Sequence, residues 1–218
     1  MKLEGELMNL DLSQNNKVHI SGVIAESAQL FYEKFGENFY VITVEVRRNS
    51  SNSDFIPVTI SERITSPEEL VLGERVDIIG QYRSYNNSMQ SGKRLVLSIF
   101  AQDVSFDVEE DFDINEIILN GFICKKPMYR VTPFGREIGD VMLAVNRAFG
   151  KSDYIPCILW GRNARYSQEI SVGDNMVIYG RIQSRKYNKK IGEEEFEERV
   201  AYEVSTSKVE VVATKAEG

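Results

Sequence analysis

The chain has 218 residues, of which 42% are hydrophobic and 27% are charged, and its formal net charge is −7. This composition is typical of a globular protein, and the length fits two domains of about 100 residues each. No apolar run approaches the ~20 residues of a membrane helix. The N-terminus lacks a basic segment followed by an apolar one, so we expect no membrane span and no signal peptide.

The few residues suited to metal binding or catalysis argue against an enzyme. The two cysteines, Cys124 and Cys157, lie in apolar strand-like runs, which indicates reduced buried thiols. His19 is the only histidine, so the usual zinc ligand sets cannot be assembled. No phosphate-binding glycine-rich motif occurs, and no set of nucleophile, base and orienting group stands out. We expect no cofactor, no metal and no enzymatic activity.

The sequence contains one domain type twice. Residues 54–60 read DFIPVTI, and residues 153–159 read DYIPCIL, at an offset of 99. At the same offset Gly22 falls on Gly121, and at an offset of 100 residues 72–74 fall on residues 172–174. Two copies are too few for a solenoid, so each copy should have its own core.

The elements of the first half follow the apolar period of two. Residues 1–16 form an N-terminal arm with no assigned element, and residues 17–106 form the first domain. Its predicted strands are residues 17–25, 39–48, 54–61, 75–85 and 93–106. A short helix is predicted within residues 61–72, because Ser66 and Pro67 are typical of the first positions of a helix. Residues 107–114 form an acidic linker that we expect to be solvated.

The second domain, residues 115–213, repeats this order before a short end at residues 214–218. Its strands are predicted at residues 117–124, 140–147, 154–160, 175–187 and 199–212, with a helix at residues 163–170. Five short strands with one helix between the third and fourth predict an all-β fold. It consists of two tandem five-stranded Greek-key barrels. A split β-sandwich is the main alternative, but it needs about seven strands.

Residues 153–161 carry the clearest functional pattern. Ile155, Cys157 and Leu159 alternate with an outer face that includes Tyr154 and Trp160, the only tryptophan. Residues 115–190 hold 6 acidic and 13 basic side chains, a net charge of +7 within an acidic chain. Aromatic rings beside positive charge are typical of a surface that stacks nucleic-acid bases. The alternative is a strand covered by protein on both sides.

Three phrases of the second repeat resemble a known family. They are NEIILNGFICKKPMYRVTPFGREIGDVMLAVNR, DYIPCILWGRNA and VGDNMVIYGRIQSRKY, in this order. Through them, about residues 115–212 resemble the bacterial single-stranded DNA-binding proteins. The resemblance implies the oligonucleotide-binding fold (OB-fold), base stacking on aromatic side chains, and phosphate contacts from Arg and Lys. It also implies a bacterial, cytoplasmic and nucleoid-associated protein.

The resemblance also implies which residues bind. Tyr154 opens the third strand, Trp160 closes it, and Tyr187 ends the phrase of the fourth strand. In the first repeat Phe55 keeps the first aromatic, and Tyr85 stands near the Tyr187 position. However, Ser61 stands in place of Trp160, and Glu45 stands in place of Ala144. We therefore expect the first repeat to bind more weakly. The candidate nucleic-acid-binding residues are Tyr154, Trp160, Tyr187, Arg147, Arg162, Arg185, Lys186, Arg130, Phe55 and Tyr85. Tyr129 and Phe134 either stack bases or pin their loop.

The sequence therefore predicts a protein that binds and protects single-stranded DNA with little sequence preference, in replication, recombination or repair. By resemblance we expect a homodimer that presents four barrels. The acidic tail with which the family recruits replication and repair proteins is not seen after residue 213. The alternatives are a primosome-like accessory module that binds proteins, and a binder of single-stranded RNA.

Overall fold

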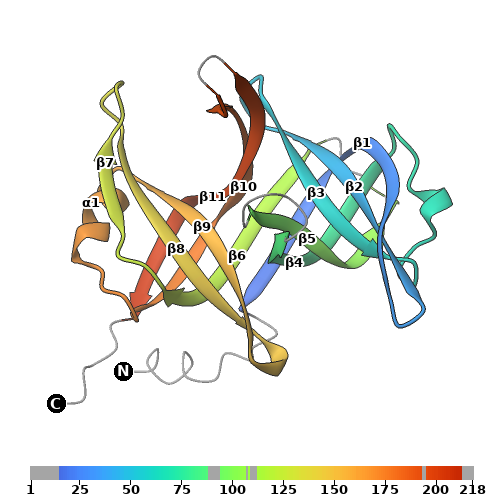
Figure 1. Cartoon of the computed structure of the whole chain (residues 1–218), viewed down its shortest axis with the longest axis horizontal. Coiled ribbons are helices and arrows are strands. Elements are labelled where there is room, and N and C mark those ends of the chain that lie inside the picture. The colour runs from blue at the N-terminus through green and yellow to red at the C-terminus, as the bar shows by residue number, and fades with distance from the viewer. Residues whose placement is uncertain (1–14, 88–93, 107, 109–111, 193–194, 213–218) are drawn as a thin grey trace.

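The structure is a computed structural model that describes residues 15–87, 94–106, 108, 112–192 and 195–212. Residues 1–14 of the predicted arm and the short C-terminal end at 214–218 lie outside the described residues, as do residues 107 and 109–111 of the acidic linker. The described chain consists mainly of strands, which form two barrels side by side (Figure 1). The all-β prediction is confirmed.

The first barrel is closed by five strands. They are β1 (Asn16–Lys34), β2 (Glu37–Arg47), β3 (Ser53–Ser61), β4 (Arg75–Asn87) and β5 (Arg94–Ser105). β2 pairs with both β1 and β3, and β3 pairs in parallel with β5. β5 then pairs with β4, and β4 returns to β1, which completes the ring.

The second barrel repeats this ring with one additional strand. Its strands are β6 (Ile114–Ile123), β7 (Met128–Val131), β8 (Glu137–Arg147), β9 (Lys151–Trp160), β10 (Asn175–Lys190) and β11 (Phe196–Val212). The closed ring is β6-β8-β9-β11-β10, and β7 pairs only with β8. Both rings are five-stranded Greek-key barrels of the OB-fold type, as predicted.

The helix predicted within residues 61–72 is wrong in extent. Only a 3₁₀ turn, η3 (Pro67–Glu69), forms there. Ser66 caps it as the sequence indicated, and the Glu69 side chain accepts a hydrogen bond from the Ser66 N–H in return. In the second barrel the same slot holds α1 (Arg162–Tyr166), followed by the 3₁₀ turn η5 (Ser167–Glu169), close to the predicted range.

The first strand of each repeat ends differently, which the sequence did not indicate. In the first repeat β1 continues to Lys34 and stays paired with β2, although the register shifts along the way. In the second repeat the corresponding path is divided into β6 and β7 around Pro127, which has no N–H to donate to a ladder. The β7–β8 hairpin therefore projects from the second barrel (Figure 1).

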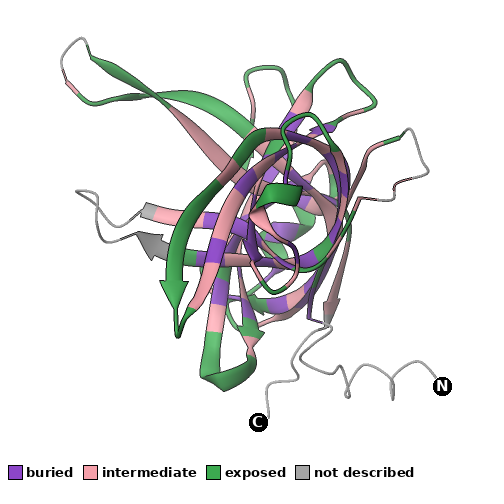
Figure 2. Cartoon of the chain, turned by 90° about the vertical axis from the view of Figure 1, so that its right-hand side faces the viewer, coloured by how far each residue is buried: buried purple, intermediate pink, exposed green. Residues whose placement is uncertain are grey.

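The cores lie inside the barrels. Ile42, Val44 and Val46 point inward and are almost fully buried, as their alternation predicted. Burial is concentrated along the barrel strands, whereas loops and hairpin ends are exposed (Figure 2). Cys157 is buried, Cys124 is half-buried, and both thiols are free. Within the described ranges, no helix has the length and apolar character needed to cross a bilayer.

The two barrels are joined by antiparallel pairing of β1 with β6. Val18 pairs with Ile117, its own equivalent in the other repeat, so the pairing has local two-fold symmetry. β4, β1, β6 and β10 are neighbours in one continuous sheet that spans both domains. Within each barrel, Gly22 lets β1 approach β2 closely and Gly121 lets β6 approach β8 closely, since an added Cβ would lie 2.2 Å from the Glu45 carbonyl oxygen and 2.5 Å from the Ala144 carbonyl oxygen.

Candidate nucleic-acid interface

The outer face of β9 carries the aromatic side chains that the sequence singled out. Tyr154 is 49% exposed, and Trp160 is half-buried. They are six positions apart, about 20 Å along an extended strand. The alternative of a strand covered on both sides is wrong for Tyr154, although Ile158 between them is buried.

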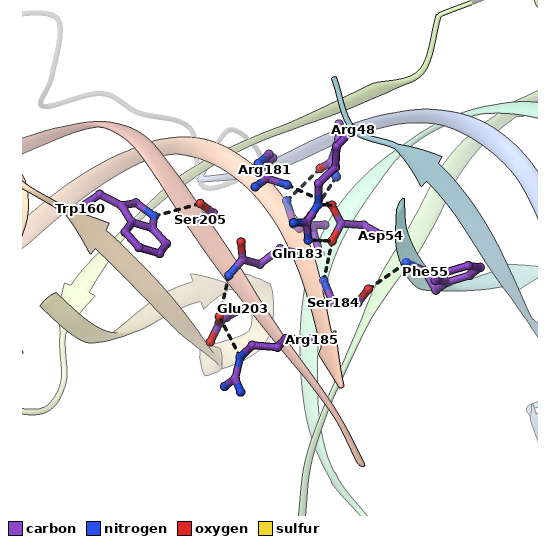
Figure 3. Close-up of polar contacts among 12 residues, drawn as sticks. Arg48, Asp54, Phe55, Trp160, Arg181, Gln183, Ser184, Arg185, Glu203 and Ser205 are labelled. Carbon is purple, nitrogen blue, oxygen red and sulfur yellow. Dashed lines mark hydrogen bonds and ion pairs between the residues drawn. The ribbon is translucent and has the colours of Figure 1, made fainter. Parts of the chain in front are cut away.

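Trp160 is held in a defined orientation. Its indole N–H donates a hydrogen bond to the Ser205 hydroxyl at 3.0 Å (Figure 3). Ser205 lies on β11, the strand that pairs in parallel with β9. The indole edge is therefore occupied by protein, and a base can reach Trp160 only through the exposed part of its ring.

Tyr187 lies on the β10–β11 hairpin, where residues 185–190 are all exposed. The Arg185 guanidinium carbon lies 5.7 Å from the centre of the Tyr187 ring. Arg185 also lies 3.9 Å from Glu203 (Figure 3), and Lys186 Nζ lies 3.0 Å from Glu198. The hairpin thus combines an aromatic ring with two cations. The Lys186–Glu198 pair is exposed on both sides and therefore weak, and Arg185 is at the outer limit of an ion-pair distance from Glu203.

The remaining predicted basic residues differ in their availability. Arg147 Nε lies 2.9 Å from Oδ2 of the fully buried Asp153. Arg130 donates two hydrogen bonds to the Asp140 carboxylate, at 2.6 and 3.2 Å. Arg162 is exposed at the first position of α1. Arg162 is therefore better placed to contact phosphate than Arg130, whose charge is already matched.

The first-domain candidates lie near the second domain. The Phe55 ring is exposed, and its N–H donates to the Ser184 hydroxyl at 2.9 Å (Figure 3). Glu45 pairs with Phe55 across β2 and β3, as Ala144 pairs with Tyr154 across β8 and β9. The expected carboxylate beside the first-domain aromatic is thus in place.

The loop aromatics of the second repeat have separate roles. Tyr129 donates its hydroxyl to Glu137 at 2.8 Å and packs against the core, so it pins the β7–β8 hairpin. Phe134 is almost fully exposed at the end of the same hairpin. The pinning interpretation holds for Tyr129 only.

Sequence reasoning missed an aromatic cluster in the first domain. The rings of Phe31 and Tyr85 lie 5.6 Å apart, and the Arg83 guanidinium carbon lies 3.7 Å from the centre of the Phe100 ring. Burial raises the pKa of Tyr85 to about 12, so its hydroxyl stays protonated at neutral pH. Phe31 lies in a tip whose aromatic content was visible in the sequence, but nothing in the spacing paired Arg83 with Phe100.

The prediction of a solvated linker is wrong for Asp113, whose side chain is buried at the end of the linker. Asp113 accepts hydrogen bonds from Arg47 and Arg75. Burial alone would raise the pKa of Asp113, but these bonds outweigh it and the pKa lies below its ordinary value. In the described part of the chain, no three His, Cys, Asp or Glu side chains form a group that could hold a metal ion.

Comparison with known proteins adds a family and a fold. Residues 114–212 match the model of the "Single-strand binding protein family". Single-stranded DNA-binding protein 1 of Staphylococcus aureus (strain COL) is 34% identical over 90 residues, which cover 38% of this chain and 54% of that protein. Single-stranded DNA-binding protein 3 of Clostridium acetobutylicum is 36% identical over 86 residues, which cover 36% of this chain and 60% of that protein. The chain thus spans somewhat more than half the length of these relatives.

A solved structure is similar over nearly the whole chain. The wild-type single-stranded DNA binding protein from Thermus aquaticus superimposes with a TM-score of 0.71 and 18% sequence identity. The match covers 93% of this chain and 95% of that one. It supports the fold of both repeats, including the first, which the family model does not reach.

Proposed function

We propose that this chain belongs to the single-strand binding protein family, whose model its residues 114–212 match, and that it binds and protects single-stranded DNA. Binding has little sequence preference, because every base has a face that can stack. The process served is DNA replication, recombination or repair. The site of action is the bacterial cytoplasm, at the nucleoid.

The outer face of β9 is the observation that carries this proposal. Tyr154 is exposed there, and the bond to Ser205 fixes the plane of Trp160. Each stacked base contributes about 1–3 kcal/mol. Tyr187 and Arg185 extend the path along β10, and Arg162, Lys186 and Arg147 supply phosphate contacts. Arg130 contributes less because the Asp140 carboxylate already matches its charge.

The division of labour between the domains is also proposed. Residues 17–106 and 115–213 act as separate OB-fold domains, joined by the linker at 107–114. The second carries the main stacking face. In the first, Phe55 and Tyr85 make weaker contacts, since Glu45 lies beside Phe55 and disfavours phosphate.

A fluorescence titration tests the proposal. Trp160 is the only tryptophan, so its emission reports on the β9 face. Oligo-dT at low salt should quench it strongly. High salt should weaken the binding, because binding releases counterions from the DNA phosphates. If emission does not change and DNA does not co-migrate with the protein, the chain is a protein-interaction module instead. Tighter binding of a matched RNA oligomer would indicate an RNA binder.

The proposal extends to the assembly state. We infer a homodimer that presents four barrels, formed through the outer face of β4, β1, β6 and β10. This face exposes Ile79 and Ile118 around the half-buried His19. Sedimentation should give twice the chain mass, and Ile118→Glu should give a monomer. A monomer for the unaltered chain would contradict the inference.

A further inference from the structure

An aromatic pocket of about 330 Å³ lies on the first domain where it meets the second. Its walls include Phe31, Tyr32, Tyr85 and Phe100, and its lining is mainly apolar. Arg147 of the second domain also lines it. A volume near 300 Å³ is at the lower end of the range for small-molecule sites. The pocket is therefore sized for one flat ring system rather than for a peptide segment.

Two guanidinium groups meet at this pocket. Arg83 and Arg147 both line it. The buried Asp153 carboxylate forms an ion pair with Arg147 at 2.9 Å, and its negative charge also acts on Arg83. Burial lowers the pKa of Arg83, and the neighbouring positive charge of Arg147 lowers it further. Among the described residues, nothing accepts a hydrogen bond from the buried Nε of Arg83. Two cations facing one carboxylate leave a positive charge that an anion would neutralise.

The same two arginines line a second, more polar cavity of about 570 Å³. Lys34, Lys151 and Phe149 lie along it. Phe149 is 98% exposed and has a φ of 63°, a backbone conformation that costs energy for a residue other than glycine. An aromatic pocket and a basic groove therefore share Arg83 and Arg147 as their boundary.

The second repeat differs at the positions that form this pocket. At the positions equivalent to Arg83 and Tyr85 it has Gln183 and Arg185, and the strand pairing places Glu203 where the first repeat has Ser98. Gln183 donates to Glu203 at 2.6 Å, and Arg185 lies near the same carboxylate (Figure 3). A carboxylate in this place would repel phosphate. The pocket is thus a property of the first repeat that the fold itself does not require.

We propose that the pocket takes one unstacked base of a bound single strand, with the adjoining phosphate at Arg83 and Arg147 and the backbone running into the basic groove. The base lies among Phe31, Tyr85 and Phe100, which provide faces for stacking and an apolar enclosure. The first domain thus has a nucleotide site of its own. The inference rests on the proposed binding of single-stranded nucleic acid and adds a second contact point to it.

Photocrosslinking on the full chain tests the site. Oligo-dT carrying 5-iodouracil is irradiated with the protein, and the adducts are mapped by mass spectrometry, while Trp160 fluorescence reports on the β9 face in the same samples. We expect adducts at Phe31, Tyr85 or Phe100. Arg83→Gln introduces the residue that the second repeat has at this position, so the strand should accept it. It should weaken binding at low salt at least fivefold, because it removes a charge-assisted contact.

Arg63→Gln is the matched control, since Arg63 is an exposed arginine of the same domain that does not line the pocket. It should change affinity less than twofold. The pocket would be overturned if Trp160 is quenched, adducts form only on β9 and β10, and Arg83→Gln binds as tightly as the unaltered chain. The proposed function would then still stand. Absence of both quenching and adducts would overturn the proposed function, and the pocket with it.

Discussion

Asp54 and Asp153 are equivalent residues of the two repeats, and each accepts a hydrogen bond from the main chain of the other domain. Asp54 Oδ1 accepts from the Ser184 N–H at 2.8 Å, and Asp153 Oδ1 accepts from the Ser84 N–H at 2.7 Å. The repeated aspartate of the DFIP and DYIP motifs therefore docks the domains.

The serines complete the relationship in the reverse direction. The Ser184 hydroxyl accepts from the Phe55 N–H at 2.9 Å, and the Ser84 hydroxyl accepts from the Tyr154 N–H at 2.8 Å. The backbone N–H of each exposed aromatic, Phe55 on β3 and Tyr154 on β9, is thus hydrogen-bonded to the opposite domain. Domain docking and presentation of the stacking face are consequences of the same contacts.

Asp153→Ala should lower the free energy of unfolding by about 2–4 kcal/mol, because it leaves the buried Ser84 N–H without an acceptor and Arg147 without its partner. Thermal unfolding followed by circular dichroism measures this. Asp140→Ala is the control. Asp140 pairs with Arg130 at a more exposed position, so its loss should cost about 1 kcal/mol or less. Equal losses in the two variants would refute the docking role of Asp153.

Combined substitution of Trp160→Ala and Tyr187→Ala should weaken oligo-dT binding at least tenfold, since two stacking contacts of about 1–3 kcal/mol each are lost. Fluorescence anisotropy of a labelled oligomer measures the affinity, and far-ultraviolet circular dichroism checks the fold. Tyr166→Ala removes an exposed aromatic from α1 instead and should leave affinity unchanged. An unaltered affinity in the double variant would exclude the β9–β10 face as the binding surface.

The strands were predictable because their signals are local. Inward positions such as Val44 and Val46 alternate with polar neighbours, and barrel interiors require this period. Because the two halves repeat, each strand predicted in one half also indicated its equivalent in the other. The residues 61–72 were misjudged because Ser66 and Pro67 fix only the start of a helix, and the turn closes after Glu69.

The proposed binding surface was predictable only in part, because the spacing of residues along the chain does not reveal which side chains meet across domains. Tyr154 and Tyr187 were visible from the family phrases. Arg83 was not, since its partner Phe100 belongs to another strand and Arg147 to the other domain. Asp113 looked solvated in an acidic run, but Arg47 and Arg75 bind it at the start of β6.

Removal of one phosphate contact should reduce the salt dependence of binding. Arg162→Gln should lower the slope of log K against log salt by about 0.7, the value for one contact with a single strand. Arg130→Gln should leave the slope nearly unchanged, because Asp140 already matches its charge with two hydrogen bonds. Titrations at four or more salt concentrations give the slopes. The reverse order of effects would place the DNA along β7 rather than along α1.

Asp113→Asn should destabilise the chain at neutral pH by about 1.5–3 kcal/mol, the range for hydrogen bonds to a charged group. The folded-state pKa of Asp113 is lowered, so its contribution is complete above the unfolded-state pKa of about 3.9 and is lost as pH falls through the lower folded-state value. Urea unfolding between pH 7 and pH 3 should show the wild type and the variant converging at the acid end. A constant difference across this range would mean that the carboxylate charge is not what binds Arg47 and Arg75.

Gly121→Ala should destabilise the second barrel by about 1–3 kcal/mol, as expected for overpacking. The added Cβ would lie 2.5 Å from the Ala144 carbonyl oxygen, and backbone on the facing strand cannot swing aside as a flexible side chain can. Gly192→Ala is the control, because its Cβ would meet nothing closer than 3.4 Å. Since Gly121 lies on β6, the strand that also pairs with β1, separation of β6 from β8 should loosen the joint between the barrels. Hydrogen exchange should therefore rise along both β6 and β1, and an increase confined to β8 would show that the barrels tolerate the strain independently.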